Sequence, residues 1–235
     1  MDPATGLHPP FAEYIPTINA DSLMAFGFFA GDMVYRPTES YWSVLDSQRQ
    51  LFDMPIYLVA GNHDRGPLLD ERLPQTTYTF TRNGDTFIIL DAGDDWTLQA
   101  DQLHLLKAAI AEASEQGHVF VLMHELLWWS PDGLYSDIKI NYAPHYPGKN
   151  NFETEVLPIL QAAQRPITLI AGDLGASEEV SSYSIDTLEQ VTLLATGMGD
   201  GKRDHMLKVE VSEDTIAIYR ELLTTGSALI LKAAR

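Results

Sequence analysis

The stretch Tyr57-Leu-Val-Ala-Gly-Asn-His-Asp64 decides how this chain is organised. An apolar run ends at Gly61, and a carboxamide, an imidazole and a carboxylate follow at once. A short apolar run bounded by glycine is typical of a buried strand, so the pattern predicts a strand that delivers Asn62, His63 and Asp64 into one place. Taken alone, the stretch also fits a Gly-Asn turn followed by a surface histidine.

Three further stretches repeat this pattern of an apolar strand followed by a polar side chain. Phe28-Phe-Ala-Gly-Asp32 lies upstream, and Val119-Phe-Val-Leu-Met-His124 and Thr168-Leu-Ile-Ala-Gly-Asp173 lie downstream. In open α/β sheets, sites lie beyond the carboxyl ends of strands, so we expect the four strand ends to meet. Their carboxylate, carboxamide and imidazole groups suit a divalent cation such as Mn²⁺, Fe²⁺, Zn²⁺ or Mg²⁺. A single Gly-Asp is often only a cap and a single buried histidine only a core residue, but their joint occurrence predicts a metal site.

The segments between these motifs predict an α/β fold. Apolar residues at helical spacing predict helices over about 38–52, 97–116 and 152–164, and strand-helix-strand units favour parallel strands. The first of these helices is expected to bury one face, made of Tyr41, Val44, Leu45 and Phe52. Asn83-Gly84 predicts a tight hairpin within residues 76–91.

The last quarter of the sequence predicts strands rather than helices. The β-rich runs, broken by glycines and a turn, are residues 180–185, 191–195, 206–211 and 215–220. Parallel units followed by such a meander predict a two-sheet α/β sandwich in a single domain over residues 1–235. The first 20 residues contain four prolines and no periodicity, which predicts an irregular segment.

Composition excludes several classes of protein. The 15 Lys and Arg residues against 33 Asp and Glu residues give a net charge of −18, which argues against nucleic-acid binding through a basic face. No apolar run approaches the roughly 18 residues of a membrane span, and there are no cysteines. No signal peptide is visible at the start of the chain. We therefore expect a soluble protein, either cytoplasmic or exported with its signal removed; the sequence does not determine the oligomeric state.

The strand-end motifs resemble those of the calcineurin-like metallophosphoesterases. The matching residues occur in the family's order: Gly31-Asp32, then Gly61-Asn62-His63-Asp64, then His124 at the end of its strand. The Gly-Asn-His-Asp element is the specific part of the match. The resemblance implies a two-sheet β-sandwich flanked by helices, a metal centre, and hydrolysis of a small-molecule phosphate ester.

The resemblance also implies roles for individual residues. Asp32 would bind metal and normally bridge two ions, while Asn62 and His124 would bind the second ion. His63 would stabilise the transition state or protonate the leaving group, and Asp64 would orient His63.

Two arginines follow directly behind two of these motifs. Arg36 and Arg65 are candidate clamps for a phosphate group, because a guanidinium can donate two parallel hydrogen bonds to it.

The chain departs from the family pattern at both ends. The family's first strand ends in Asp-x-His, but no such motif precedes Asp32; Asp2 and His8 lack its spacing. Where the family has Gly-His-x-His, this chain has Gly172-Asp173-Leu174-Gly175. Two ligands of the first ion and one histidine of the second are thus absent, and Asp173 is the candidate replacement. We therefore expect one divalent ion per chain, held by the residues Asp32, Asn62, His124 and Asp173.

Three interpretations of function compete at this point. The first is a divergent phosphoesterase with a reduced, single-metal centre. The second is a binding or accessory protein that has kept the fold and lost turnover, holding a carbohydrate or lipid headgroup with the aromatic loop 125–150. The third is an ordinary two-metal enzyme whose amino-terminal strand is missing from this chain, which would not explain Asp173 and Gly175.

Overall fold

The computed structural model describes residue 7 and residues 9–140, 150–174, 180–199, 203–224 and 226–234. The helices are α1 (Pro9–Ala20), α2 (Glu39–Arg49), α3 (Leu69–Arg72), α4 (Ala100–Glu112) and α5 (Leu157–Ala162), with a 3₁₀ turn η1 (Asn62–Asp64) and a π-helical turn η2 (Phe152–Val156). The strands are β1 (Gly27–Ala30), β2 (Ile56–Val59), β3 (Tyr78–Arg82), β4 (Asp85–Ile89), β5 (Val119–Met123), β6 (Ile167–Ala171), β7 (Tyr183–Leu188), β8 (Val191–Thr196), β9 (His205–Val211), β10 (Thr215–Leu222) and β11 (Gly226–Ala234).

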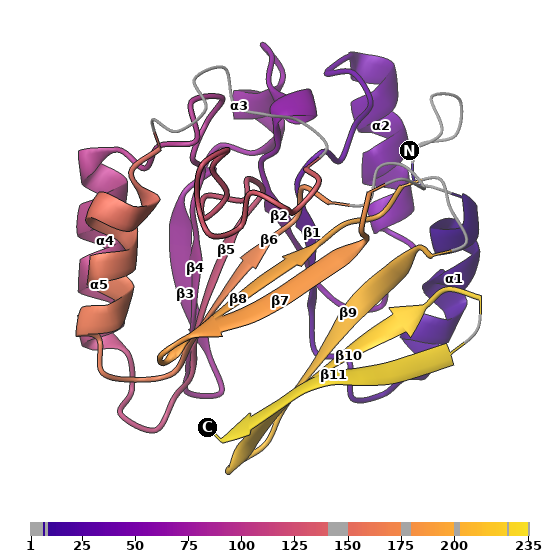
Figure 1. The fold of residues 1–235 in the computed structure, drawn as a ribbon. Helices are drawn as coiled ribbons and strands as arrows, with labels where there is room; N and C mark the ends of the chain where they lie inside the picture. Colours follow the sequence, from indigo (N-terminus) through magenta and orange to yellow (C-terminus); the bar gives the residue numbers. More distant parts are fainter. Residues whose placement is uncertain are drawn as a thin grey trace.

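Within the described residues, the strands form three sheets (Figure 1). The large sheet has the order β3-β4-β5-β6-β8-β7, the C-terminal sheet has the order β11-β10-β9, and β1 pairs with β2. In the large sheet β4, β5, β6 and β8 are parallel, while β3 and β7 are antiparallel edge strands. β1 and β2 are also parallel. The loops that follow β5 and β6 therefore leave the large sheet at one edge, as the loops after β1 and β2 leave their pair.

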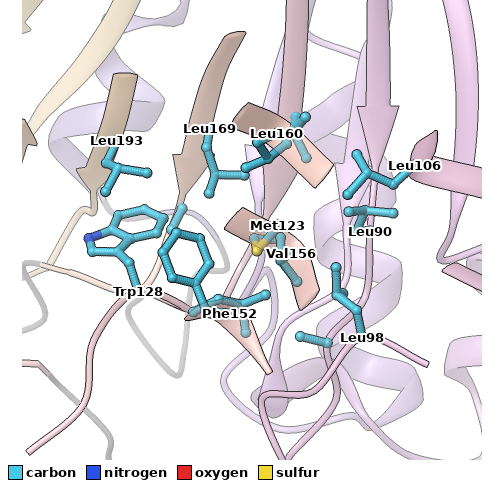
Figure 2. Packing of buried hydrophobic residues seen from close by; sticks show 14 of the residues in the cluster. Leu90, Leu98, Leu106, Met123, Trp128, Phe152, Val156, Leu160, Leu169 and Leu193 are labelled. Atoms are coloured by element: carbon cyan, nitrogen blue, oxygen red, sulfur yellow. The ribbon is translucent and has the colours of Figure 1, made fainter. Parts of the chain in front are cut away.

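Alternate residues of the large sheet face two different cores, because successive side chains of a strand point to opposite faces. In β5, Val121 and Met123 face α4 and α5, while Phe120 and Leu122 face the other sheets. Figure 2 shows the first core, where Phe152, Val156 and Leu160 pack against residues of the large sheet. The second core is the interface between sheets, where the large sheet meets Val59 of β2 and Ile216 and Ile218 of β10. This is the predicted two-sheet sandwich.

A third core lies on the outer side of the β1–β2 pair. Side chains of α1 and α2 pack there against Leu58 and Ala60, so the layers run helix, sheet, sheet, helix. In Figure 1 α4 and α5 lie on one side of the sandwich and α1 and α2 on the other. The predicted β-sandwich flanked by helices is confirmed, and the helix ends lie within about four residues of the predicted ones.

The prediction of an irregular segment over residues 1–20 is wrong for residues 9–20, which form α1. Pro9 and Pro10 occupy its first turn, where a missing N–H costs nothing. Pro16 lies inside the helix, and burial of one face compensates for its lost hydrogen bond. That face consists of Phe11, Ile15 and Ile18. Residues 1–6 and 8 lie outside the described residues, so Asp2 and His8 are not placed.

Two other expectations need correction. In α2 the predicted Leu45 is buried, but Val44 is exposed and the second buried side chain of the helix is Trp42, so the buried face is only partly the predicted one. In the C-terminal part, the sequence did not predict β11, and the run 180–185 is displaced to β7. β11 is an exposed edge strand without clear alternation, which removes the pattern on which strand prediction depends.

No helix in the described ranges has the length and apolar character that crossing a membrane requires.

Candidate metal centre

Four loops that leave parallel strands bring the predicted ligands to the same edge of the sandwich. Asp32 follows β1 and Asn62 follows β2, which are parallel neighbours. His124 follows β5 and Asp173 follows β6, which are parallel neighbours in the large sheet. The site therefore forms between two facing layers rather than along one sheet.

Two glycines allow the layers to approach this closely. A Cβ atom on Gly31 would lie 2.2 Å from Nδ1 of His124, and one on Gly172 would lie 1.8 Å from the carbonyl oxygen of Ala30. Neither distance is possible for a side chain larger than hydrogen. The Gly-Asp elements of the sequence are thus also packing elements: Gly31 makes room for His124, and Gly172 makes room for the Ala30 backbone of the opposite layer.

His124 is held so that one ring nitrogen faces the two carboxylates. Its Nδ1 lies 2.8 Å from the carbonyl oxygen of Ala30, and since a carbonyl only accepts, Nδ1 carries the proton. Nε2 lies 3.4 Å from Oδ2 of Asp32 and 3.9 Å from Oδ1 of Asp173. Nε2 is buried and has no hydrogen-bond partner within the described part of the chain. This buried nitrogen lone pair faces negative charge, an arrangement that a cation would stabilise.

The spacing of these atoms suits a shared metal ion. Asp32, His124 and Asp173 each offer a ligand atom, and these atoms all lie within 4.8 Å of one another. Atoms that share an ion through bonds of about 2.0–2.2 Å lie roughly 3–4.4 Å apart, a range that contains the distances of 3.4 and 3.9 Å from Nε2 of His124 to the two carboxylates. Two carboxylates and an imidazole are a donor set for Mn²⁺, Fe²⁺ or Zn²⁺. The three residues therefore fit a divalent metal ion, as their sequence pattern predicted.

The pKa values of His124 and Asp32 also indicate that the cluster favours a positive charge. Burial lowers the pKa of His124, but the nearby carboxylates of Asp32, Asp173 and Glu125 outweigh burial and raise this pKa to about 10. Burial raises the pKa of Asp32, yet His124 and the His63 backbone outweigh burial and lower it. The cluster thus favours a cation, which is a proton when no metal is bound.

Asp32 connects the ligand cluster to His63. While its Oδ2 faces His124, its Oδ1 accepts a hydrogen bond of 2.9 Å from the backbone N–H of His63. Asp32 has a φ of 51°, in the left-handed region that non-glycine residues rarely adopt. The His63 ring is exposed, and its Nδ1 lies 3.0 Å from the carbonyl oxygen of Tyr35. Asn62 is half-buried at the start of the same turn η1.

Asp64 is fully buried and its carboxylate binds backbone groups. Oδ1 accepts from the N–H of Val34 at 3.0 Å, and Oδ2 accepts from the N–H of Gly61 at 2.9 Å. Burial raises the pKa of Asp64 to about 7. Asp64 therefore joins the loop after β1 to the loop after β2, and the orientation of the His63 ring comes from Tyr35.

The two candidate phosphate clamps lie in different surroundings. Arg36 is exposed, with its guanidinium carbon 5.7 Å from the centre of the Tyr35 ring. Arg65 is partly buried and surrounded by the carboxylates of Asp91, Asp94 and Glu125.

Asp91 and Glu125 are acids near the site that sequence reasoning missed. Asp91 follows the apolar run that ends β4, the same pattern that identified Asp32, so the signal was present. Glu125 follows His124 directly and is 1% exposed, and burial raises its pKa to about 7.

The aromatic side chains of the 125–150 loop that the structure describes pack inward. Trp128 belongs to the core, Trp129 donates to the carbonyl of Ile138, and the Tyr135 hydroxyl donates to Asp186. These three side chains are therefore held by contacts within the protein. Residues 141–149, with Tyr142, His145 and Tyr146, lie outside the described residues.

Gly172→Ala is expected to lower both stability and metal affinity. The new Cβ would displace the Ala30 carbonyl, which also holds Nδ1 of His124. Overpacking of this kind costs about 1–3 kcal/mol of unfolding free energy. Urea denaturation and Mn²⁺ titration would measure the two effects. Gly27→Ala is the matched control, because a Cβ there meets only the flexible ends of Ile56 and Met54; equal effects of both variants would contradict the prediction.

The family of the chain is now clear. A model of the calcineurin-like phosphoesterases matches residues 11–175, and the chain belongs to this family. The matched range contains the strand-end motifs from Gly31 to Asp173. Calcineurin-like phosphoesterases are metal-dependent, which agrees with the donor set described above. No curated protein matches the sequence.

One solved structure supports the fold. Purple acid phosphatase PPD1 from seeds of yellow lupin (Lupinus luteus) superposes with a TM-score of 0.67 at 13% identity, over 96% of this chain and 49% of that chain. The chain thus spans about half the length of that phosphatase, and at this identity the likeness shows the fold alone. A predicted phosphoesterase from Streptococcus pneumoniae TIGR4 gives a TM-score of 0.44 at 12% identity, over 99% of this chain and 93% of that chain.

Proposed function

We propose that this protein hydrolyses a small phosphate ester with the help of one divalent metal ion. The ligands would be Asp32, His124 and Asp173, with Asn62 as a fourth. The observation that carries the proposal is the buried Nε2 of His124, which faces two carboxylates and has no hydrogen-bond partner within the described residues. A metal ion bound there would act as a Lewis acid on a phosphoryl oxygen.

His63 is the proposed proton carrier. Its Nδ1 carries a proton toward the Tyr35 carbonyl, which leaves Nε2 as the ring atom free for the substrate; with a second proton on Nε2, the imidazolium would give that proton to a leaving oxygen and return to the neutral ring. The backbone of His63 is bound to Oδ1 of Asp32. The ligand cluster and the proton carrier therefore keep a fixed separation, which is what positioned acid–base catalysis requires.

Asp64 and Arg36 have supporting roles in this proposal. Asp64 fixes the turn that carries Asn62 and His63 by binding the backbone at Gly61 and Val34. Arg36 is an exposed cation one residue beyond Tyr35, the residue that contacts the His63 ring. It is the proposed phosphate clamp, since its guanidinium faces solvent and can donate to an incoming anion.

Two measurements on the purified protein test the proposal. Metal analysis should find a bound divalent ion, and hydrolysis of a chromogenic phosphate monoester should depend on added Mn²⁺ and stop with a chelator. Bound metal without hydrolysis of mono- or diesters would overturn the enzymatic proposal and favour an accessory protein that has kept the fold.

Metal titration should give one ion per chain. In the described residues, Asp32, His124 and Asp173 make the one group of three or more acids or histidines with metal spacing. One oxygen of Asp32 is already bound to the His63 N–H, which leaves the other for the ion. Calorimetry with Mn²⁺ and anomalous diffraction would count the ions. Two well-occupied ions, or none near Asp173, would contradict this prediction.

A further inference from the structure

Arg65 makes an ionic connection across the sandwich beside the metal centre. It follows the turn η1 that carries Asn62 and His63. Its Nη2 lies 2.5 Å from Oδ1 of Asp91, and its Nη1 lies 3.4 Å from Oδ2 of the same carboxylate. The same Nη2 lies 3.5 Å from Oε1 of Glu125. One guanidinium thus joins the loop after β2 to the loops after β4 and β5.

The surroundings of Arg65 leave it little capacity for a phosphate. Its Nε lies 3.1 Å from Asp94, so each of its three nitrogens is near a carboxylate. The side chain is 25% exposed, while those of Asp91 and Glu125 are 11% and 2% exposed. Three carboxylates around one guanidinium leave the group with net negative charge, which repels an incoming dianion.

Arg65 and Glu125 are close in sequence to the proposed catalytic and metal-binding residues. Arg65 is two residues beyond His63, and Glu125 is the residue directly after His124. Their ion pair therefore couples the position of the proton carrier to that of the metal ligand. Asp64 fixes the other side of η1 to the loop after β1. Together the two contacts hold η1 against both layers of the sandwich.

We infer that Arg65 is a positioning residue that holds Asn62 and His63 at their working distance from the metal centre through Asp91 and Glu125, and that it does not bind the substrate phosphate. The inference rests on the proposed function for its kinetic consequence. Its structural part, the fixing of η1, stands independently of turnover.

The kinetic test compares Arg65→Gln and Arg65→Lys with the unaltered protein. Misplacement of a catalytic group by about 1 Å can cost up to 100-fold in rate, so Arg65→Gln is expected to lower kcat by roughly 10- to 100-fold. Its KM should change by less than about threefold and its metal content should stay the same. Arg65→Lys keeps the positive charge but loses the planar guanidinium that binds two carboxylates. Its kcat should lie between those of Arg65→Gln and the unaltered protein. Adding Asp91→Asn to Arg65→Gln should lower kcat little further, because the two substitutions break the same contact between Arg65 and Asp91.

Arg72→Gln is the matched control. Arg72 is 23% exposed and joins Asp46 and Glu39, so its loss also removes an arginine bound to two carboxylates, but this arginine connects α3 to α2 and does not contact Asp91 or Glu125 in the described residues. It should leave kcat unchanged. An equal loss of kcat in Arg72→Gln would overturn the inference in favour of a general loss of stability. A tenfold rise in KM with constant kcat in Arg65→Gln would also overturn it and make Arg65 a phosphate ligand.

Two readouts decide the inference even if no ester is hydrolysed. Hydrogen exchange of peptides covering residues 60–66 should be faster in Arg65→Gln and unchanged in Arg72→Gln. The affinity of the Mn²⁺-loaded protein for inorganic phosphate should change by less than about threefold in Arg65→Gln. Unchanged exchange, or a tenfold weaker phosphate affinity, would overturn the inference. Absence of hydrolysis in the unaltered protein would by contrast count only against the proposed function.

Discussion

Asp173→Ala is expected to weaken Mn²⁺ binding by at least about 100-fold, because changes outside the ligand set already cost 10–100-fold and this change removes a ligand. The Asp173 carboxylate is 4% exposed and lies 3.9 Å from Nε2 of His124. Without it, the ion would keep a single carboxylate among the three clustered residues. Isothermal calorimetry and metal analysis of the purified variant would measure the loss.

Asp85→Ala is the control for this prediction. Asp85 is as buried as Asp173, at 5% exposed, and accepts a hydrogen bond from the His118 backbone. It begins β4, whereas the metal cluster lies beyond the carboxyl ends of the strands. Both variants remove a buried carboxylate, but only Asp173→Ala should lose metal. Retention of one ion per chain in Asp173→Ala would mean that Asp173 is not a ligand.

His63→Ala is expected to lower turnover by about 10²- to 10⁴-fold, the usual contribution of a general acid–base group. Metal content should stay constant, because the ring is exposed and contacts the Tyr35 carbonyl rather than the ligand cluster. The His63 backbone, which binds Asp32, is retained in the variant. Initial rates with a chromogenic ester, alongside metal analysis of the same sample, would separate the two effects.

His104→Ala serves as the comparison, since His104 is also an exposed histidine but lies on α4. His104→Ala should change neither the turnover nor the metal content. Loss of metal in proportion to rate in His63→Ala would make His63 a ligand, and an unchanged rate would remove it from the mechanism.

Local sequence patterns determined the strands that build the site. Each is a short apolar run followed by a glycine or a polar residue, a local pattern that can be recognised without knowing any distant contact. The hairpin is the clearest case, since Asn83 and Gly84 have φ values of 52° and 86°, as a tight turn between β3 and β4 requires. β6, Ile167–Ala171, contains the apolar run that the sequence places before Gly172 and Asp173. The order of these strands along the chain also predicted the sandwich.

Elements stabilised by distant packing escaped prediction. α1 contains Pro16 and depends on burying Phe11, Ile15 and Ile18 against α2 and the β1–β2 pair. Its local signals are those of a loop, and tertiary contacts outweigh them. β11 escaped prediction for a different reason. It is an edge strand with no fully buried residue, so its sequence lacks the alternation of apolar and polar residues that identifies a strand.

The sequence by itself predicted that Asp32, His124 and Asp173 would lie together at the candidate metal centre, because a strand end fixes where its next side chain emerges. Only the tertiary structure decided what each of them does. Asp32 and Asp64 are the same residue type after similar strands, yet Asp32 faces His124 while Asp64 binds the backbone of Val34, 30 residues away. Arg36 and Arg65 likewise differ only in what surrounds them, solvent for one and three carboxylates for the other. The role of a charged group depends on its neighbours in space, and strand periodicity carries no information about groups in the opposite layer.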